Sequence, residues 1–166
     1  MDERNAIVDL IPRLRRYARA LVGDRFAADD LVQDTLERAW SKFHLYRGGT
    51  DLRAWMFTLM HNVHVNRVRA QRPVDALPDD GPETLQPGEQ GDPLMIRDLE
   101  RALTSLPEEQ REVLLLVALE DMSYDQAART LGVPIGTVMS RLSRGRERLR
   151  KKMFDAPVTA KLTVVK

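Results

Sequence analysis

A proline- and glycine-rich acidic stretch at residues 73–93 divides this chain into two parts. The stretch holds five prolines, three glycines and six acidic residues, with no lysine or arginine. A segment of this composition cannot bury enough apolar surface to offset the entropy lost on ordering. We therefore predict a flexible, extended linker at 73–93. Folded modules are expected at 1–72 and 94–153, followed by a short tail at 154–166 that shows no clear pattern.

The formal net charge of +1 conceals an uneven distribution of charge along the chain. Residues 1–72 hold 13 basic and 9 acidic side chains, and residues 94–166 hold 13 and 10. The predicted linker supplies the compensating negative charge. The near-neutral total therefore describes two basic modules joined by an acidic tether.

Apolar residues at helical spacing predict three helices in the first module. The first helix ends at Gly23, and Asp24 is a suitable N-cap for the second. Asp51 is a suitable N-cap for the third, after a loop at residues 46–50. We expect the buried faces to be formed by Ile7, Leu10, Ile11, Leu14, Tyr17, Ala18 and Leu21, then by Leu31, Val32, Leu36, Ala39, Trp40 and Phe43, and then by Leu52, Trp55, Met56, Leu59 and Val63.

Two polar stripes run along these helices. The first lies opposite the buried face of the second helix and consists of Asp30, Gln33, Asp34 and Glu37. Taken alone, such a stripe is usually a solvated face. The other lies along the third helix and consists of Asn62, Asn66 and Arg69. Asparagine has no propensity advantage in mid-helix, so either a partner or a structural role explains this second stripe.

The second module is predicted to end in a helix-turn-helix at residues 123–153. A helix over 94–103, a capping box at Ser105–Glu108 and an apolar run over 113–119 come before it. Ser123 and Gln126 form a second capping box, and Gly132 ends the short helix that this box begins. We expect the first helix to pack through Tyr124, Ala127, Ala128 and Leu131, and the second through Ile135, Val138, Leu142, Gly145 and Leu149.

The second helix of this motif carries concentrated positive charge. Residues 139–153 hold seven basic side chains and one acid, Glu147. A basic helix end can be a solvated surface favoured by the helix dipole. Joined by a tight turn to a capped helix, it instead favours placement in the major groove of DNA.

Other functional classes find little support in the sequence. His61 and His64 lie three residues apart, but the chain has no cysteine and no obvious third metal ligand nearby. There is no Walker-type phosphate loop and no Gly-x-Ser-x-Gly elbow. We therefore predict no catalytic residue, metal or cofactor, and no enzymatic activity. The charged N-terminus and the lack of a long apolar run predict a cytoplasmic protein without membrane insertion.

Three ordered segments resemble the extracytoplasmic-function (ECF) group of bacterial sigma-70-type sigma factors over residues 5–153. The first runs from Asp29 to Trp40, and the second comprises Leu52–Met56 with Asn62 and Asn66. The third comprises Leu106–Val113 and Gly136–Leu142. The resemblance implies an all-α fold of two small helical domains. It also implies a subunit that directs RNA polymerase to promoters by binding the −35 element and melting the −10 element.

For the first module, the resemblance implies contacts with polymerase and with the −10 element. The stripe of Asp30, Gln33, Asp34 and Glu37 is similar to the surface that docks on the clamp helices of the largest polymerase subunit. The loop and third helix resemble the part that holds an extruded base, a role that suits the Tyr46 ring and the Asn62 amide. Neighbouring bases or backbone are implied to contact Asn66, Arg67 and Arg69.

For the second module, the resemblance implies the −35 reader. Base edges are implied to face Ser140, Ser143 and Arg144, with Thr137 at the start of the same helix. Phosphates are implied to contact Arg141, Arg146 and Arg148. Many family members carry a basic or aromatic residue where Met139 and Ser143 stand here, so the resemblance does not give the −35 sequence.

The resemblance also implies partners and leaves alternatives. The implied partners are core RNA polymerase, through its clamp helices and flap, promoter DNA, and an anti-sigma factor that covers the same surfaces. One alternative is a sigma-like decoy that sequesters an anti-sigma factor. Another is a conventional helix-turn-helix regulator, which needs no acidic docking stripe and usually dimerises on a palindrome.

Overall fold

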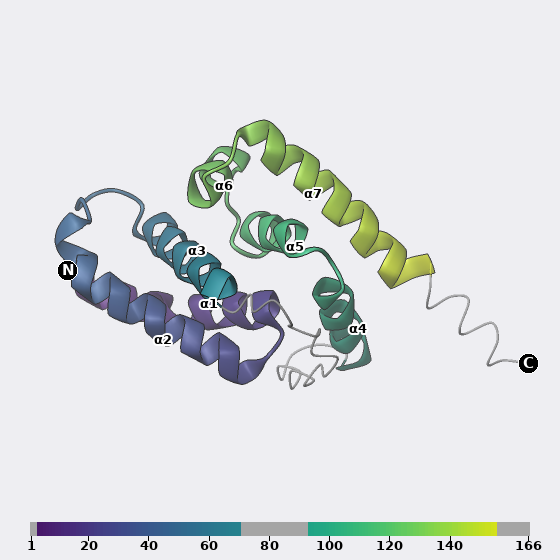
Figure 1. The fold of residues 1–166 in the computed structure, drawn as a ribbon, viewed down its shortest axis with the longest axis horizontal. Coiled ribbons are helices and arrows are strands. Elements are labelled where there is room, and N and C mark those ends of the chain that lie inside the picture. Colours follow the sequence, from purple (N-terminus) through teal and green to yellow (C-terminus); the bar gives the residue numbers. More distant parts are fainter. Residues whose placement is uncertain (1–2, 71–92, 156–166) are drawn as a thin grey trace, which may run out of the picture.

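The computed structural model describes residues 3–70 and 93–155, which form helices joined by short connections (Figure 1). The first module contains α1 (Glu3–Val22), α2 (Arg25–Lys42), the 3-10 turn η1 (Phe43–Leu45) and α3 (Leu52–Ala70). The second contains α4 (Pro93–Thr104), α5 (Glu108–Leu114), the π turn η2 (Leu115–Leu119), α6 (Tyr124–Leu131), α7 (Ile135–Arg150) and the π turn η3 (Lys151–Asp155). The predicted all-α fold is confirmed for these residues. The predicted linker, apart from Pro93, and the tail beyond Asp155 lie outside them.

The helix boundaries of the first module follow from local chemistry. Gly23 ends α1 with a φ of +81°, a conformation that other residues rarely adopt. The Asp24 carboxylate then accepts hydrogen bonds from the amides of Phe26 and Ala27 at 3.3 and 3.2 Å. Asp51 accepts from the Ala54 amide at 3.2 Å at the start of α3. These bonds satisfy amides that have no partner within a helix, as the sequence predicts.

The helix-turn-helix is formed by α6 and α7. Ser123 and Gln126 exchange two hydrogen bonds of 3.1 Å, which complete the predicted capping box. Gly132 ends α6 with a φ of +66°. Helix α7 then rests closely on α5, because a Cβ atom at Gly145 would lie only 3.0 Å from the Leu114 side chain. Val138 and Leu142 of α7 are buried as well, and the residues on the opposite face of α7 are exposed.

Four expectations about packing and capping are wrong. Trp40 is 45% exposed, because the buried stripe of α2 passes through Thr35, whose hydroxyl donates to the Leu31 carbonyl. Tyr124 and Ile135 are 36% and 47% exposed, since each is the first residue of its helix and projects past the packed turns. Ser105 forms no capping box; its hydroxyl donates to the Ala102 carbonyl at the end of α4, and Pro107 is the N-cap of α5.

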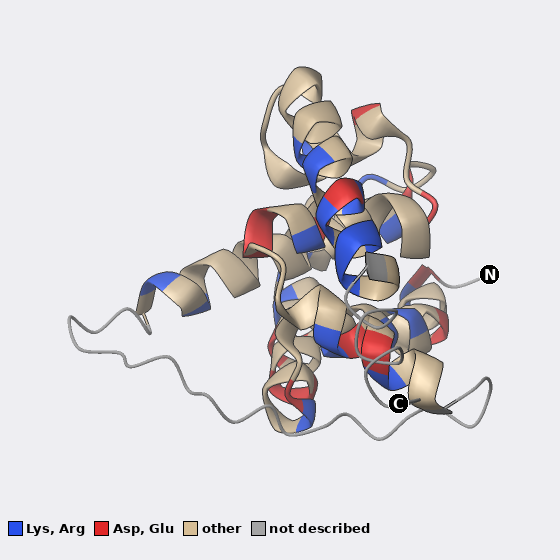
Figure 2. Ribbon diagram, turned by 90° about the vertical axis from the view of Figure 1, so that its right-hand side faces the viewer, with Lys and Arg blue, Asp and Glu red and all other residues tan. Residues whose placement is uncertain are grey.

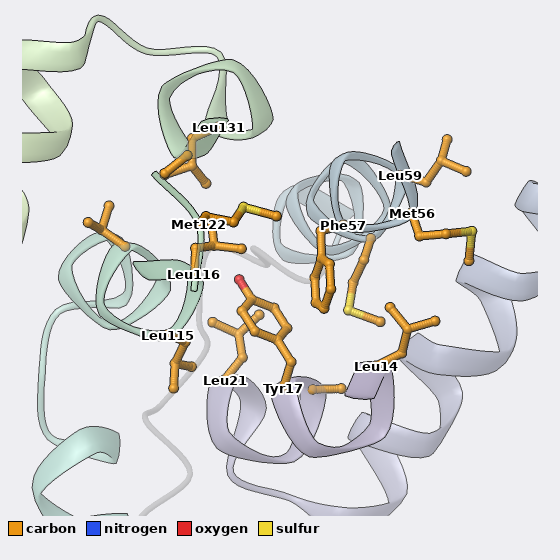
Figure 3. Packing of buried hydrophobic residues seen from close by; sticks show 14 of the residues in the cluster. Leu14, Tyr17, Leu21, Met56, Phe57, Leu59, Leu115, Leu116, Met122 and Leu131 are labelled. Carbon is orange, nitrogen blue, oxygen red and sulfur yellow. The ribbon is translucent and has the colours of Figure 1, made fainter. Parts of the chain in front are cut away.

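The two modules also pack against each other, which the sequence pattern did not predict. Helix α1 contacts α4, α5 and η2, and α3 contacts α6. Tyr17 of α1 points toward Leu116 and Met122 of the second module, and Phe57 of α3 meets the Tyr17 ring edge-on with centroids 5.0 Å apart (Figure 3). All four side chains are buried. Burial of such side chains stabilises the fold by about 1.5–3 kcal/mol each, so the contact between modules is substantial.

Candidate nucleic-acid interface

The exposed face of α7 carries most of the residues predicted to read DNA. Acidic and basic positions are interspersed over the molecule as a whole (Figure 2), but α7 contains five arginines and one glutamate. The side chains that point into solvent are those of Ser140, Ser143, Arg144, Arg146 and Arg148. Since α7 rests on α5 through its opposite face, this surface is open to a large partner such as a DNA groove.

Two residues of the predicted set are less open. Thr137 is half-buried in the first turn of α7. Arg141 is also half-buried, and its guanidinium lies 3.7 Å from the Glu109 carboxylate of α5. The pair fixes the direction of the Arg141 side chain at one edge of the α7 surface.

A shallow groove of about 370 Å³ lies beside these side chains. Its wall is partly apolar and partly basic, and it is lined by Tyr124, Met139, Leu142, Ser143, Arg146, Glu147 and Arg150. Met139 is 52% exposed at its edge. The groove therefore extends the α7 surface toward the start of α6.

The loop after η1 holds an aromatic cluster. The Tyr46 ring lies 5.2 Å from Trp55 and 5.8 Å from Phe43, measured between ring centroids. Its hydroxyl donates to the Thr50 carbonyl at 2.8 Å, which closes the loop. Trp55 packs against the hydrophobic core, as the sequence pattern predicts, but it is only half-buried. Its ring also contacts Tyr46, so Trp55 joins the core to this aromatic cluster.

The polar side chains of α3 continue from this cluster. Asn62, Asn66 and Arg69 are exposed. They follow Trp55 at intervals that keep them on one side of the helix, and Asn62 lies two turns, about 10 Å, along the axis from it. An aromatic platform followed by amide and guanidinium groups can stack an unpaired base and bond its edge.

The acidic stripe on α2 is exposed and is coupled to α3. Asp30, Gln33, Asp34 and Glu37 all face solvent. The guanidinium of Arg67 donates to the Asp34 carboxylate, with its Nε at 3.1 Å, and to the Asp30 carbonyl at 3.1 Å. The structure thus brings Arg67 of α3 together with the acidic stripe of α2.

The two histidines of α3 contact glutamates of the second module. His61 pairs with Glu112, and His64 pairs with Glu108. Within residues 3–70 and 93–155, no group of three or more His, Asp or Glu side chains could hold a metal ion. Sequence spacing could not identify these pairs, because each joins residues of different modules.

Burial and pairing shift the pKa of several groups between the modules. The hydrogen bond from His64 lowers the pKa of Glu108. Burial raises the pKa of Glu120, against the opposing effect of Arg13 and Arg16. Burial also raises the pKa of Tyr17, and the nearby carboxylates Glu112, Glu120 and Glu108 raise it further. These carboxylates therefore face the first module.

Each of the two modules matches a described protein family. "Sigma2 domain of PhyR" matches residues 7–61, and "Sigma-70, region 4" matches residues 96–149. The ECF RNA polymerase sigma factor EcfG of Rhodopseudomonas palustris (strain TIE-1) is 36% identical over 154 residues, which are 91% of this chain and 84% of that protein. The ECF RNA polymerase sigma factor SigL of Mycobacterium tuberculosis (strain ATCC 25618 / H37Rv) is 37% identical over 155 residues, covering 88% of this chain and 85% of the relative.

Solved structures give the same result. The sigma factor RpoE in complex with the anti-sigma factor NepR from Bartonella quintana matches with a TM-score of 0.82 and 33% identity, covering 92% of this chain and 96% of that one. CnrH in complex with the cytosolic domain of CnrY matches with a TM-score of 0.67 and 26% identity, covering 92% and 86%. None of the helices within residues 3–70 and 93–155 has the length and apolar character that a membrane span requires.

Proposed function

This chain belongs to the family of ECF RNA polymerase sigma factors, and we propose that it directs core RNA polymerase to promoters with two elements. The observation that carries the proposal is the presence of two different surfaces in one chain. One is the basic, solvent-facing side of α7, and the other is the acidic stripe on α2. A conventional helix-turn-helix regulator has a use for the first surface only.

The α7 surface is proposed to bind the −35 element. Ser140, Ser143 and Arg144 face the base edges, and Thr137 lies at the entry of the helix into the groove. The guanidiniums of Arg146 and Arg148 contact phosphates, which position the helix without reading sequence. Arg141 reaches a phosphate from the edge of the surface, where Glu109 directs it.

The α3 surface is proposed to bind the −10 element as a single strand. The aromatic cluster of Phe43, Tyr46 and Trp55 offers a stacking face to an extruded base. Asn62 bonds the edge of that base, and Asn66 and Arg69 contact the next nucleotides along α3. Arg67 is proposed to hold the acidic stripe in position against α3 through its hydrogen bonds to Asp34 and Asp30.

The acidic stripe is proposed to dock on the clamp helices of the polymerase, and the second module on the flap. Carboxylates at Asp30, Asp34 and Glu37 with an amide at Gln33 suit a basic helical surface. The domain limits proposed are 1–72 for docking and −10 binding and 94–153 for −35 binding. The chain has no catalytic step of its own and works in the bacterial cytoplasm, where its DNA and polymerase lie.

An anti-sigma factor is the further proposed partner. The RpoE and CnrH structures are complexes of this kind, with NepR and with the cytosolic domain of CnrY. RpoE aligns with 92% of this chain at 33% identity, which supports a similar mode of inhibition here.

One observation favours a second candidate, a decoy that sequesters an anti-sigma factor. Residues 7–61 match the "Sigma2 domain of PhyR". PhyR is an anti-anti-sigma factor whose structure is solved in complex with the anti-sigma factor NepR. PhyR is 15% identical to this chain and shares its fold. A decoy needs no exposed arginines on its helix-turn-helix, so the α7 surface favours the sigma factor.

Run-off transcription tests these alternatives. Purified core polymerase is incubated with a fragmented genomic library, with and without this chain. New discrete transcripts that share two upstream elements are the expected result. Core binding without new transcripts supports the decoy, and DNA binding without core binding supports a conventional regulator.

A further inference from the structure

One exposed side chain of α7 differs in kind from its neighbours. Met139 is 52% exposed. Beyond the first residue of α7, the other exposed residues of this helix are glycine, serine, arginine and glutamate. A single exposed apolar residue is ordinary on a protein surface, so exposure alone indicates no role. What Met139 can bind depends on where it lies on α7.

Met139 lies at one edge of the α7 face that is proposed to bind base edges. An α-helix turns by about 100° per residue, which places Met139 and Arg141 at opposite edges of this face, with Ser140 between them. Glu109 holds the Arg141 guanidinium at its own edge, at 3.7 Å. At the other edge, Met139 and Ser143 line the shallow groove that reaches the start of α6. Near the start of α7, the face therefore has a basic edge and an apolar edge.

Gly136 lies three residues before Met139 and is exposed as well. A Cβ atom at Gly136 would have no heavy atom of the described chain within 4 Å, and the residue has no positive φ. Neither packing nor backbone conformation requires glycine here, although glycine destabilises a helix relative to alanine. The N-terminal residues of a recognition helix are those that contact base edges. The missing side chain lets the helix backbone approach the bases closely, within reach of the Met139 side chain.

The major groove of DNA offers one distinctive group to an apolar side chain. Guanine, adenine and cytosine present hydrogen-bond donors and acceptors there, whereas thymine adds a C5-methyl group to its acceptor. The thioether of methionine donates no hydrogen bond and accepts only weakly, so it recognises no base by hydrogen bonding. Its contact with a thymine methyl removes apolar surface of both groups from water. The Met139 side chain therefore fits thymine better than any other base.

We propose that Met139 selects a thymine in the −35 element by contacting its C5-methyl group, and that Gly136 allows the close approach that this contact needs. This role rests on the proposed binding of the −35 element by α7. It adds a specificity-determining residue to that surface and names the base that the residue selects. The −35 element is therefore expected to hold a thymine, on either strand, opposite the N-terminal half of α7.

Replacement of single thymines by uracil tests the contact directly, because uracil keeps the pairing and the O4 acceptor and lacks only the methyl group. The probe is a promoter duplex recovered in the run-off experiment, in which each thymine of the −35 element is replaced in turn. Binding is measured with the full chain in complex with core RNA polymerase. Uracil at one position is expected to weaken binding about fourfold, as for the loss of one buried methyl group. A −35 element without such a position overturns the proposal.

Variants of Met139 assign the effect to this side chain. Met139→Leu keeps an apolar side chain and should retain the uracil effect at the same position. Met139→Gln has a similar length and a polar end, and should lose the effect there, because burial of an amide against a methyl group is costly. Met95→Ala removes a similarly exposed methionine, 59% exposed on α4, and is the control in which the effect should persist. A uracil effect that is unchanged at every position in Met139→Gln overturns the proposal.

Gly136→Ala tests the close approach. The added methyl group meets no atom of the described chain, and alanine favours a helix more than glycine does, so thermal stability should not fall. Binding of the same duplex should weaken severalfold, because the methyl group takes up space between the helix and the bases. Unchanged binding by this variant overturns the part assigned to Gly136.

Separate outcomes distinguish the role of Met139 from the proposed function. If the chain binds DNA but not core polymerase, the sigma-factor function fails. The uracil test then uses the chain alone, with a duplex that it selects from a random-sequence library, and still decides the role of Met139. If the complex directs transcription and no uracil effect depends on Met139, the function stands and the thymine contact is overturned. A chain that binds no duplex DNA, with or without core polymerase, overturns both.

Discussion

The guanidinium of Arg111 in α5 donates a 2.6 Å hydrogen bond to the carbonyl of Leu21 in α1. The same group donates to the carbonyls of Leu103, Thr104 and Leu106 at 2.7 to 2.9 Å. One side chain thus connects the ends of two helices and the turn before α5. Burial lowers the pKa of Arg111, but an arginine remains charged throughout the physiological range.

Replacement of Arg111 should therefore destabilise the whole fold. Arg111→Ala removes the guanidinium donor from four carbonyls, and the expected loss in the free energy of unfolding is about 3 kcal/mol. Arg111→Lys should recover less than half of this, because an ammonium cannot reproduce the planar set of donors. Urea unfolding followed by circular dichroism measures both. Arg129→Ala breaks an exposed pair with Asp125 and is the control, with an expected loss below about 0.5 kcal/mol.

Glu120 should make stability depend on pH. Its side chain is fully buried, and burial raises its pKa above the ordinary value of 4.5. The folded chain therefore binds this proton more readily than the unfolded chain. The stabilising effect of that proton is complete below pH 4.5 and is lost as the pH rises through the raised pKa. At neutral pH the buried charge is a cost.

Glu120→Gln should remove that cost. The free energy of unfolding at pH 7 is expected to rise by about 1 kcal/mol, since Arg13 and Arg16 remain solvated on their own. The difference between variant and parent should shrink as the pH falls. The pKa of Glu108 is lowered, so its contribution to stability is lost only in acid. Parent and Glu120→Gln variant both contain Glu108, so this loss does not affect the difference between them. A variant that is less stable than the parent at pH 7 would show that the ion pairs outweigh burial.

The helices and most of their caps could be predicted from the sequence because local chemistry determines them, although the capping box expected at Ser105 does not form. The box of Ser123 and Gln126 and the turn at Gly132 each depend on residues within a few positions. The exposure of Trp40 could not be predicted, because Thr35 is one of the buried residues of α2 and the buried face is therefore turned away from Trp40. The Thr35 hydroxyl is satisfied by a carbonyl of its own helix, so the side chain can be buried like an apolar one. A pattern of apolar residues does not include threonine and therefore misses this buried position.

The surfaces could be predicted only in part, for a related reason. The α7 arginines and the α2 stripe follow from helical spacing alone. Contacts such as Arg67 with Asp34 and His61 with Glu112 join separate helices, so they depend on how those helices pack. The predicted separation of the modules by a linker also gave no reason to expect that they share a core.

The acidic stripe should be required for polymerase binding and not for folding. Asp34→Arg with Glu37→Arg reverses two exposed charges, and the expected result is loss of core binding in a pull-down or by fluorescence anisotropy. Asp34 also holds Arg67, so Arg67→Ala is made in parallel as the control for that contact. Arg67→Ala keeps the carboxylates and should weaken core binding by less than about tenfold. Normal binding by the folded double variant would rule out the stripe as the docking surface.

The α3 and α7 surfaces should act at different steps of transcription initiation. Asn62→Ala removes one amide from the exposed side of α3, and Arg144→Ala removes one guanidinium from α7. Loss of a specific base contact costs about 1–3 kcal/mol, which is roughly a fivefold to 160-fold change in affinity. Asn62→Ala should lower the rate of promoter opening, followed by permanganate reactivity of unpaired thymines, and should leave −35 duplex binding by the polymerase complex within twofold. Arg144→Ala should weaken duplex binding and leave opening of a pre-melted template unchanged. Equal effects of the two substitutions on both steps would contradict the division of −10 and −35 binding between α3 and α7.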